Sequence, residues 1–593
     1  MKRFGLLIGL MTIWASPASS QDVSLFVNSE DEALERTLRQ DSLTIETAGL
    51  EEAISQDIVA AALADYRRLL TVLYAYGYYG GTISILIDGR EAATLEPLFA
   101  PPQIAQVNIS VNPGPLFAFG SINYSPLAEG TELPKDLATD EPALSGLIQD
   151  GAQAGVNEWR NRGHAKAVVT NQAIVANHID TQLNVAVAIS PGPVLTFGEF
   201  TVAGNENVRT DAIERIAGFP TGGIYSPKDI DTVTQRLRRA GAFDGVALIE
   251  AEEIGPNDTL AVTAQVRESK PRRFGFSLEF SNVEGLHVTS FWMHRNAFGG
   301  AERFRVEGEI AGIGGFTGGV DYRLATSLSV PAIYGPDTTL LATANVSRED
   351  EPDYLLDRLR FGVGATRLIG DDIIGQAGFA ILRAREATDI ETRSYTLLTL
   401  PFGLELDRRD NEKDAKSGYF VDTLATPFIG LQGGGEGGRI VLDARGYRSI
   451  GSDDQLTLAG RLQVGSLIGA EIENTPADFL FYSGGGGTVR GQPYNDLGLT
   501  EGDVTTGGRS FLGAQLEARY AISDNLGVVG FWDYGYVGSS STPGQSGDSH
   551  SGLGIGVRYN TFIGPLRLDV ATPADGDDAF RGVEFYIGIG QAF

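Results

Sequence analysis

The chain has 593 residues, no cysteine and a formal net charge of −30 at pH 7. Without cysteine it can form neither disulfides nor thiolate metal sites, and its negative charge disfavours nucleic acid and other polyanionic partners. After the N-terminal leader, no stretch offers the ~20 uncharged apolar residues of a transmembrane helix, which excludes a helical membrane protein.

The first segment, residues 1–20, is predicted to be a secretory signal peptide. Lys2 and Arg3 precede an apolar run from Phe4 to Trp14, and small residues follow to Ser20. This apolar run is too short to cross a membrane, so we expect cleavage near Ser20 and export of the mature chain.

The next 250 residues are repetitive. The segment Pro113–Gly120 recurs as Pro191–Gly198, and an amphipathic helix followed by glycine and a short strand occurs three times, with the glycines at Gly77, Gly163 and Gly241. Glycine readily takes the left-handed conformation that ends many helices. The pattern predicts three small α+β domains, at residues 22–104, 105–193 and 194–269. A generic series of α+β modules is the alternative.

From residue 270 to residue 593 the sequence reads almost entirely as strands. Arg303 and Arg305, for example, alternate with Phe304 and Val306. In a soluble sandwich the charged face would meet solvent, whereas in a membrane barrel it lines a wet lumen and the apolar face meets lipid. Together with the signal peptide and the C-terminal Phe, this favours a transmembrane antiparallel β-barrel. Its length allows about 16 strands at ~10 residues each plus turns.

A glycine run, Gly484–Gly487, precedes Val489, Arg490 and Gly491 late in this region. No Gly-Lys-Ser/Thr follows, so the run is not a phosphate-binding loop. If Arg490 points into a narrow lumen, its guanidinium needs carboxylate partners that satisfy its planar fork. A flexible, solvated loop is the alternative for this segment.

The chain ends in a period-two pattern that stops at Phe593. A C-terminal strand with a terminal Phe is typical of bacterial outer-membrane barrels. We expect it, from about Glu584 to Phe593, to close the barrel by pairing with a first strand from about Phe274 to Phe280.

Two glycines lie inside this last strand, where they weaken packing and pairing. The predicted gate seam comprises Phe274, Phe276, Gly588, Gly590 and Phe593. Opening it would expose backbone groups that an incoming strand could satisfy by β-augmentation. The alternative is that the glycines only relieve crowding.

These features resemble the POTRA-plus-barrel superfamily of outer-membrane assembly and secretion factors, over essentially the whole mature chain. Its members carry Val-Arg-Gly-Phe/Tyr at the tip of the sixth extracellular loop, which folds back into the lumen. The segment Phe531–Val537 resembles their Phe-x-Asp-x-Gly-x-Val strand. The resemblance implies that Arg490 pairs with Asp533 and with Glu517 on the preceding strand. Gln492 departs from the pattern because an aromatic residue usually follows the glycine, and Tyr494 is the candidate replacement.

Three domains before the barrel resemble the TamA family within this superfamily. The resemblance implies insertion or secretion of autotransporters and other barrel proteins at the outer membrane, with the POTRA domains in the periplasm. It also implies an inner-membrane-anchored TamB-like partner bound through these domains. The runner-up is a two-partner secretion transporter, which carries an apolar plug helix and threads an unfolded polypeptide through its lumen. A passive channel is the third hypothesis.

Nothing in the sequence indicates an enzyme or a cofactor. The histidines form no i, i+4 ligand pair; they are His164, His178, His287, His294 and His550. The segment Gly547–His550 is similar to a lipase serine block, but its Gly/Ser-rich surroundings predict a surface loop.

Overall fold

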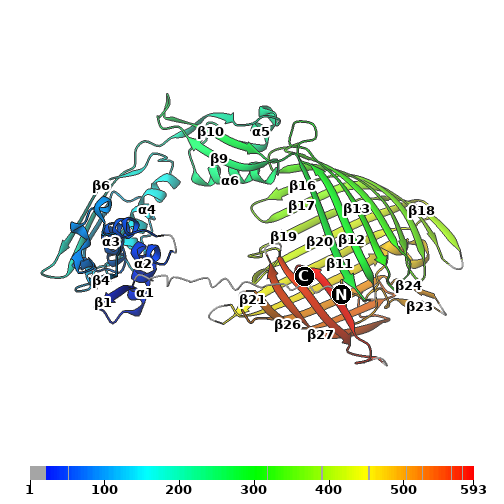
Figure 1. The fold of residues 1–593 in the computed structure, drawn as a ribbon. Coiled ribbons are helices and arrows are strands. Elements are labelled where there is room, and N and C mark those ends of the chain that lie inside the picture. The colour runs from blue at the N-terminus through cyan, green and yellow to red at the C-terminus, as the bar shows by residue number, and fades with distance from the viewer. Residues whose placement is uncertain are drawn as a thin grey trace, which may run out of the picture. The chain divides into compact units, whose positions relative to one another are not determined.

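The computed structural model describes the chain from residue 22 onward with short gaps, so the predicted signal peptide lies outside the described residues. The described ranges are 22–50, 53–282, 284–316, 318–388, 391–451, 454–501, 504–523, 525–561, 564–576 and 579–593. The chain divides into two compact units (Figure 1). The first comprises residues up to 198 with 221–229 and 253–260, and the second comprises 199–220, 230–252 and 261–593.

The first α+β domain has a four-stranded sheet with the order β1-β4-β2-β3, in which β1 runs parallel to β4. Leu34 and Leu38 of its first helix are fully buried in the domain core together with Leu69. Its elements are β1 (Asp22–Val27), α1 (Glu32–Asp41), α2 (Leu43–Ala48), α3 (Ser55–Ala75), β2 (Thr82–Ile87), β3 (Arg90–Glu91) and β4 (Gln106–Asn112), with short 3-10 turns at Ala92–Thr94 and Pro97–Phe99.

The predicted boundary between residues 104 and 105 is wrong by one strand. β4 lies beyond that boundary, yet it pairs with both β1 and β2 and completes the first sheet. The Pro-Gly-Pro motif follows the last strand of a domain, as it also does after β7, so it marks the connection between domains. The first domain therefore extends to Asn112.

The second and third domains repeat this plan with three-stranded sheets, ordered β5-β7-β6 and β8-β10-β9. Gly77, Gly163 and Gly241 follow α3, α4 and α6 with φ of 85°, 95° and 71°, the left-handed conformation expected of a helix-ending glycine. The elements are β5 (Ala118–Ser125), α4 (Ser145–Asn161), β6 (Val168–Asn177), β7 (Gln182–Ser190), β8 (Thr196–Ala203), α5 (Thr210–Ala217), α6 (Pro227–Arg239), β9 (Phe243–Glu250) and β10 (Thr259–Glu268).

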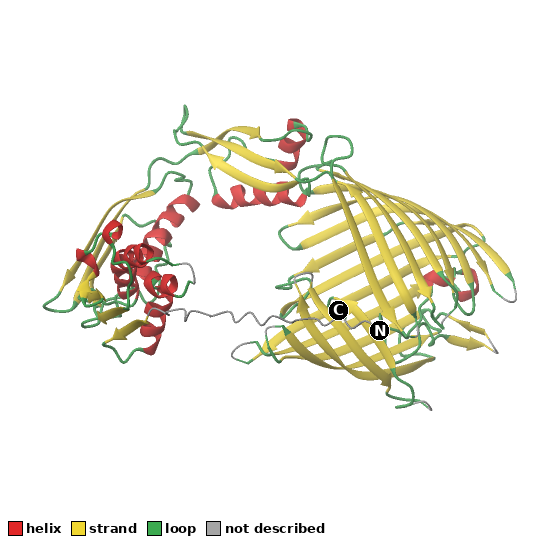
Figure 2. Cartoon of the chain, viewed as in Figure 1, coloured by secondary structure: helices red, strands yellow, loops and turns green. Residues whose placement is uncertain are grey.

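The rest of the chain forms a closed antiparallel barrel (Figure 2). Its strands are β11 (Arg272–Ser281), β12 (Gly285–His294), β13 (Arg303–Ile313), β14 (Asp321–Pro331), β15 (Thr338–Asp350), β16 (Leu355–Ile369), β17 (Ile373–Ala387), β18 (Thr392–Thr399), β19 (Phe402–Asp407), β20 (Ser417–Gln432), β21 (Glu436–Ile450), β22 (Leu456–Ile468), β25 (Ser510–Ala521), β26 (Leu526–Gly538), β27 (Gly547–Thr561), β28 (Gly564–Pro573) and β29 (Glu584–Ile589). β18 and β19 both pair with β17 and β20, so they form one interrupted strand and the described barrel has 16 positions.

The fold class predicted from the sequence, α+β repeats followed by an antiparallel barrel of about 16 strands, is confirmed. The alternation places apolar side chains outward: Leu359, Phe361 and Val363 of β16 are 36%, 54% and 40% exposed. Arg358, which directly precedes Leu359, instead pairs with Asp478 of a loop inside the lumen. No helix among the described residues is long and apolar enough to cross a membrane.

Candidate functional site

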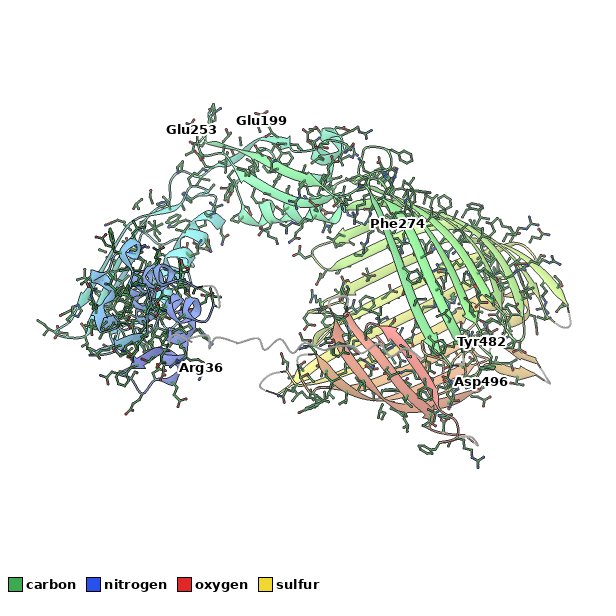
Figure 3. The ribbon with its side chains drawn as sticks, in the orientation of Figure 1. Arg36, Glu199, Glu253, Phe274, Tyr482 and Asp496 are labelled. Atoms are coloured by element: carbon green, nitrogen blue, oxygen red, sulfur yellow. The ribbon has the colours of Figure 1, made fainter. Side chains whose placement is uncertain are left out.

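The long connection between β22 and β25, called loop 6 below, enters the barrel lumen. It contains two 3-10 turns (Ile472–Asn474 and Ala477–Phe479) and a short hairpin, β23 (Leu499–Glu501) and β24 (Val504–Thr506). Its Phe479, Leu480 and Phe481 pack against apolar residues of strands distributed around the wall, including Leu382 of β17 and Val537 of β26. Figure 3 labels Tyr482 and Asp496 of this loop. These apolar contacts anchor this part of the loop to the inner wall, whereas charged side chains such as Glu349 and Arg358 line the cavity beside it.

The tip of loop 6 is fixed by Arg490, whose side chain is 1% exposed. Its Nε and Nη2 donate to the two carboxylate oxygens of Asp533 at 2.7 and 2.9 Å, and its Nη1 donates to Glu517 Oε1 at 2.7 Å. A third carboxylate, Asp569 of β28, lies 3.3 Å from the same Nη1. The guanidinium carbon also lies 3.6 Å from the ring centroid of Phe531. The structure thus brings Arg490, Glu517 and Asp533 together, as the resemblance implies.

Two further arginines complete this buried cluster. Arg519 Nε donates to Glu517 Oε2 at 2.8 Å, and Arg558 Nη1 donates to Asp569 Oδ1 at 2.5 Å. With Arg490 and Asp533, these make three arginines and three carboxylates, whose formal charges cancel; a fourth arginine, Arg567, lies at the edge with its Nε 3.9 Å from Asp569 Oδ2 and is itself paired with Glu279. Such balance is necessary because an unpaired charge in a dry site costs several kcal/mol. No motif in the sequence predicts that Asp569, Arg519 or Arg558 belongs to the cluster.

Glycines let the loop tip approach the wall this closely. A Cβ on Gly552 of β27 would lie 1.9 Å from the carbonyl oxygen of Arg490, and one on Gly535 of β26 would lie 2.9 Å from Val489 Cγ2. Gly491 has φ of 89°, and a Cβ there would meet the backbone of Thr572 at 2.6 Å. Val489 is fully buried. The Val-Arg-Gly motif therefore fits a surface that the wall glycines leave open.

Gln492 makes a polar contact where the family pattern has an aromatic residue. Its Nε2 donates to the Ser551 carbonyl at 2.8 Å, and the residue is 8% exposed. Tyr494 is 39% exposed, and the aromatic ring against the guanidinium belongs to Phe531 of the wall.

The prediction that Gly547–His550 forms a surface loop is wrong. These residues begin β27, and His550 is 7% exposed. Its Nε2 lies 2.9 Å from the hydroxyl of Ser483 in loop 6. The histidine thus joins the wall to the loop.

The seam between the first and last strands is short. β11 and β29 share two residue pairs, Phe280 with Ile587 and Ser281 with Tyr586. In contrast, every residue of β11 pairs with β12 on its other side. Within the described residues, the Arg272–Glu279 edge of β11 pairs with no strand on the β29 side.

The predicted seam residues lie in three different places. Phe274 and Phe276, on the unpaired edge of β11, are 74% and 67% exposed (Figure 3 labels Phe274). Gly588 pairs with Arg567 of β28. The Glu279–Arg567 ion pair, 2.8 Å long, links β11 to β28 across the position of Gly588. A Cβ on Gly588 would lie 3.3 Å from Arg567 Nη2 and 3.5 Å from Glu279 Oε1, so this glycine leaves room for the ion pair.

The prediction that Gly590 and Phe593 belong to the seam is wrong. β29 ends at Ile589, and Gly590 has φ of 102°. Phe593 packs against Tyr447 and other luminal residues at 7% exposure, and its carbonyl oxygen accepts from Arg519 Nη2 at 3.1 Å. The main-chain oxygen of Phe593 thus receives a charge-assisted hydrogen bond from a buried arginine inside the lumen.

Residues 296–593 match the Omp85 superfamily domain, and residues 195–269 match the POTRA domain described as a surface antigen variable number repeat. Two solved structures are similar. One is BamA from Haemophilus ducreyi lacking POTRA domains 1–3, with a TM-score of 0.63 and 14% identity over 80% of this chain and 100% of that one. The other is CdiB from Acinetobacter baumannii, with a TM-score of 0.52 and 13% identity over 81% and 90%. At these identities the likeness shows the fold.

The fold and the locked loop define an outer-membrane β-barrel preceded by POTRA repeats. The match over half of the sequence goes further: the chain belongs to the Omp85 superfamily. Barrels of this superfamily lie in the outer membrane with their POTRA domains in the periplasm, and they serve outer-membrane assembly or transport.

Proposed function

We propose that this protein is a TamA-like assembly factor that inserts autotransporters and other barrel proteins into the outer membrane through its seam. It acts without an enzymatic step or a cofactor. The observation that carries the proposal is the Arg272–Glu279 edge of β11, which lacks a strand partner on the β29 side among the described residues.

Such an edge is costly inside a bilayer. Each backbone N–H or C=O without a partner in hydrocarbon costs several kcal/mol, so an incoming strand that pairs with the edge is strongly favoured. Pairing uses the main chain and therefore accepts many sequences, which suits a factor that handles diverse substrates. The exposed Phe274 and Phe276 on the same strand offer apolar contacts to lipid or to an entering strand.

The lumen is less suited to threading a polypeptide. Loop 6 packs against the inner wall through the Arg490 cluster, and the C-terminal tail occupies the lumen around Phe593. In addition, Leu34 and Leu38 of α1 are buried in the first α+β domain, so this helix does not have the exposed apolar face of a plug. These features support the assembly factor over a two-partner secretion transporter or a passive channel.

The periplasmic domains provide the surface for a TamB-like, inner-membrane-anchored partner. The first domain exposes a pair of large apolar side chains, Leu98 and Phe99, at 82% and 79%. We expect photo-crosslinkers at these positions of the full-length chain to capture the partner from envelope membranes. The control position is Ile179 of the second domain, which is 94% exposed. Equal capture from all three positions, or none, would argue against a docking site on the first domain.

A reversible lock on the seam tests the proposal. The chain lacks cysteine, so Phe280→Cys with Ile587→Cys places one disulfide between paired seam residues. Oxidation should reduce assembly of an autotransporter in reconstituted vesicles to background, and a reductant should restore it. The control pair, Val346→Cys with Leu359→Cys, joins β15 to β16 away from the seam and should change nothing.

The other outcomes separate the alternatives. Full assembly by the locked chain would refute lateral release. Export of an unfolded polypeptide by the locked chain would favour the two-partner transporter, and a large steady conductance in a planar bilayer would favour the channel.

A further inference from the structure

The glycine run of loop 6 touches both sides of the seam. On the β11 side, Glu284 lies in the turn that joins β11 to β12. Its Oε1 accepts a hydrogen bond from the Gly486 N–H at 3.0 Å, and its own N–H donates to Ser281 Oγ at 3.2 Å. Loop 6 is thereby tied to the end of the first barrel strand.

On the β29 side, the contact is Tyr586, which is 3% exposed. Its hydroxyl accepts from the Gly491 N–H at 3.2 Å and donates to Glu584. Gly486 lies over the ring, because a Cβ built on it would be 3.4 Å from two ring carbons of Tyr586. Loop 6 is thus tied to the last strand as well.

These two ties meet at the only paired part of the seam among the described residues. Ser281, which accepts from Glu284, is the register partner of Tyr586. Gly491 directly follows Arg490, so the Tyr586 tie is continuous with the buried arginine cluster. The contacts run from Ser281 to Glu284, from Glu284 to loop 6 and from loop 6 to Tyr586. Because Tyr586 is paired with Ser281 across the seam, they form a closed ring.

The glycines are required by this close approach. Gly485 has φ of 82°, and a Cβ on it would lie 2.5 Å from Glu284 Oε1. A side chain there would displace the carboxylate from Gly486. The sequence of the glycine run is also consistent with a flexible loop. The structure gives it a second explanation, because only glycines let the main chain of loop 6 come close enough to bond with Glu284.

We propose that loop 6 is a strap that holds the seam closed, and that Glu284 and Tyr586 are the positioning residues that couple the seated loop to the two strand ends. When either contact is lost, the seam opens from the end at Ser281 and Tyr586 while Arg490 stays bound. The idea that opening of the seam releases substrate rests on the proposed function. The coupling of loop 6 to the two seam strands does not depend on it.

A second tie also crosses the seam and provides the competing explanation. The Glu279–Arg567 ion pair joins β11 to β28 without involving loop 6, and the Glu279 side chain is 52% exposed. If this ion pair alone closed the seam, removing the Glu284 contact would have no effect on seam opening.

Amide hydrogen exchange of the full chain in vesicles, without substrate, measures seam opening directly. Glu284→Ala should accelerate exchange of segments 280–282 and 584–587 roughly tenfold, the effect of losing one hydrogen bond to a charged group. Glu284→Gln keeps an oxygen acceptor and should restore exchange close to wild type. Tyr586→Phe removes only the hydroxyl and should also accelerate exchange. Glu309→Ala, which removes a luminal carboxylate paired with Arg323, is the control.

Exchange is compared only for protein that shows the gel mobility of the folded barrel. If Glu284→Ala does not fold, Tyr586→Phe decides the question. Wild-type exchange at the seam in the folded variants would overturn the strap. Faster seam exchange with unchanged autotransporter assembly would support the strap and contradict the proposed route of release, so the two ideas can fail separately.

Discussion

The barrel wall is held together in two different ways. Between β15 and β16 every residue from Thr338 to Asp350 has a register partner, so the backbone ladder alone closes the wall. Between β11 and β29, two residue pairs are present in the part of the chain that the structure describes. Closure of the cylinder and stability of the cylinder are therefore separable, because the weakest junction does not depend mainly on its ladder.

Side chains inside the lumen replace the missing ladder. The strap through Glu284 and Tyr586 and the Glu279–Arg567 ion pair both connect the two sides of the seam from within. The C-terminal tail adds a link to the buried cluster, because Arg519 binds both Phe593 and Glu517. A seam held by luminal side chains can open without breaking any other strand pair.

The largest expected effect comes from removing the arginine at the centre of the cluster. Arg490→Ala leaves the buried Asp533 carboxylate without its ion-pair partner, and breaking a buried ion pair costs about 3–5 kcal/mol. We expect the denaturant midpoint of the barrel, followed by tryptophan fluorescence in vesicles, to fall accordingly. Arg490→Lys should be intermediate, because lysine keeps the charge but cannot form the bidentate contact with Asp533.

The matched control lies in the fully paired wall. Arg348 makes a two-pronged ion pair with Asp357 across β15 and β16, but its side chain is 51% exposed. Arg348→Ala should leave the midpoint unchanged because the ladder there is complete. Equal losses for the two variants would contradict the idea that the seam side depends on buried luminal contacts.

A smaller effect is expected from filling the space that the loop occupies. Gly552→Ala places a methyl group where the Arg490 carbonyl now lies 1.9 Å away, so the loop tip must shift at a cost of about 1–3 kcal/mol. Gly530→Ala on β26 is the control, because its Cβ meets nothing within 4 Å. Unfolding midpoints compare the two. A loss for Gly530→Ala as large as that for Gly552→Ala would mean that strand glycine itself, and not the loop contact, matters.

The strands and the α+β repeats could be predicted because each depends on a local pattern. Buried and exposed side chains alternate along wall strands such as β17, β25 and β29, and Gly77, Gly163 and Gly241 end their helices as expected. The error at the first domain boundary had a different source. β4 joins its sheet by pairing with β1, more than 80 residues earlier in the chain, and no local pattern specifies such a partner.

For the same reason, only part of the buried arginine–carboxylate cluster could be predicted from the sequence. Asp569 lies on the same inward face of its strand as Arg567, so the alternation predicts that it faces the lumen. Its distance to Arg490 depends on how far loop 6 extends into the barrel, which no local pattern specifies. The position of Phe593 could not be predicted because it depends on Arg519 and Tyr447, which are distant in sequence. Gln591 interrupts the apolar phase of Phe585, Ile587 and Ile589, and the strand ends at Ile589.

A modest effect is expected from the ion pair that crosses the seam. Glu279→Gln removes its charge, and because the Glu279 side chain is 52% exposed, the loss should be about 1 kcal/mol or less. We expect amide exchange at Gly588 to rise slightly, and less than it rises in Glu284→Ala. High salt should mimic the substitution by screening the pair. An effect larger than that of Glu284→Ala would make the ion pair, and not the strap, the main tie.

The smallest effect concerns the segment from which β11 starts. Oε1 of Glu268, at the end of β10, accepts from the N–H groups of Glu206, Asn207 and Val208, each at 2.8 Å. The same loop reaches the barrel, because the Arg209 N–H donates to the Gly299 carbonyl at 2.8 Å. Burial raises the pKa of Glu268, but these hydrogen bonds outweigh burial and hold the pKa below its ordinary value.

A carboxyl with a lowered folded-state pKa stabilises the fold above its unfolded pKa of about 4.3 and loses that contribution as the pH falls through the folded value. A spin label at Glu206→Cys should therefore gain mobility as the pH falls below this range, and Glu268→Gln should show the same mobility at every pH. The exchange of β15 amides, corrected for the pH dependence of the intrinsic exchange rate, serves as the reference, because the paired wall should not respond to Glu268. If the label mobilises with the same pH profile in Glu268→Gln, another group controls the loop, and the first strand is not anchored from the third domain through this carboxylate.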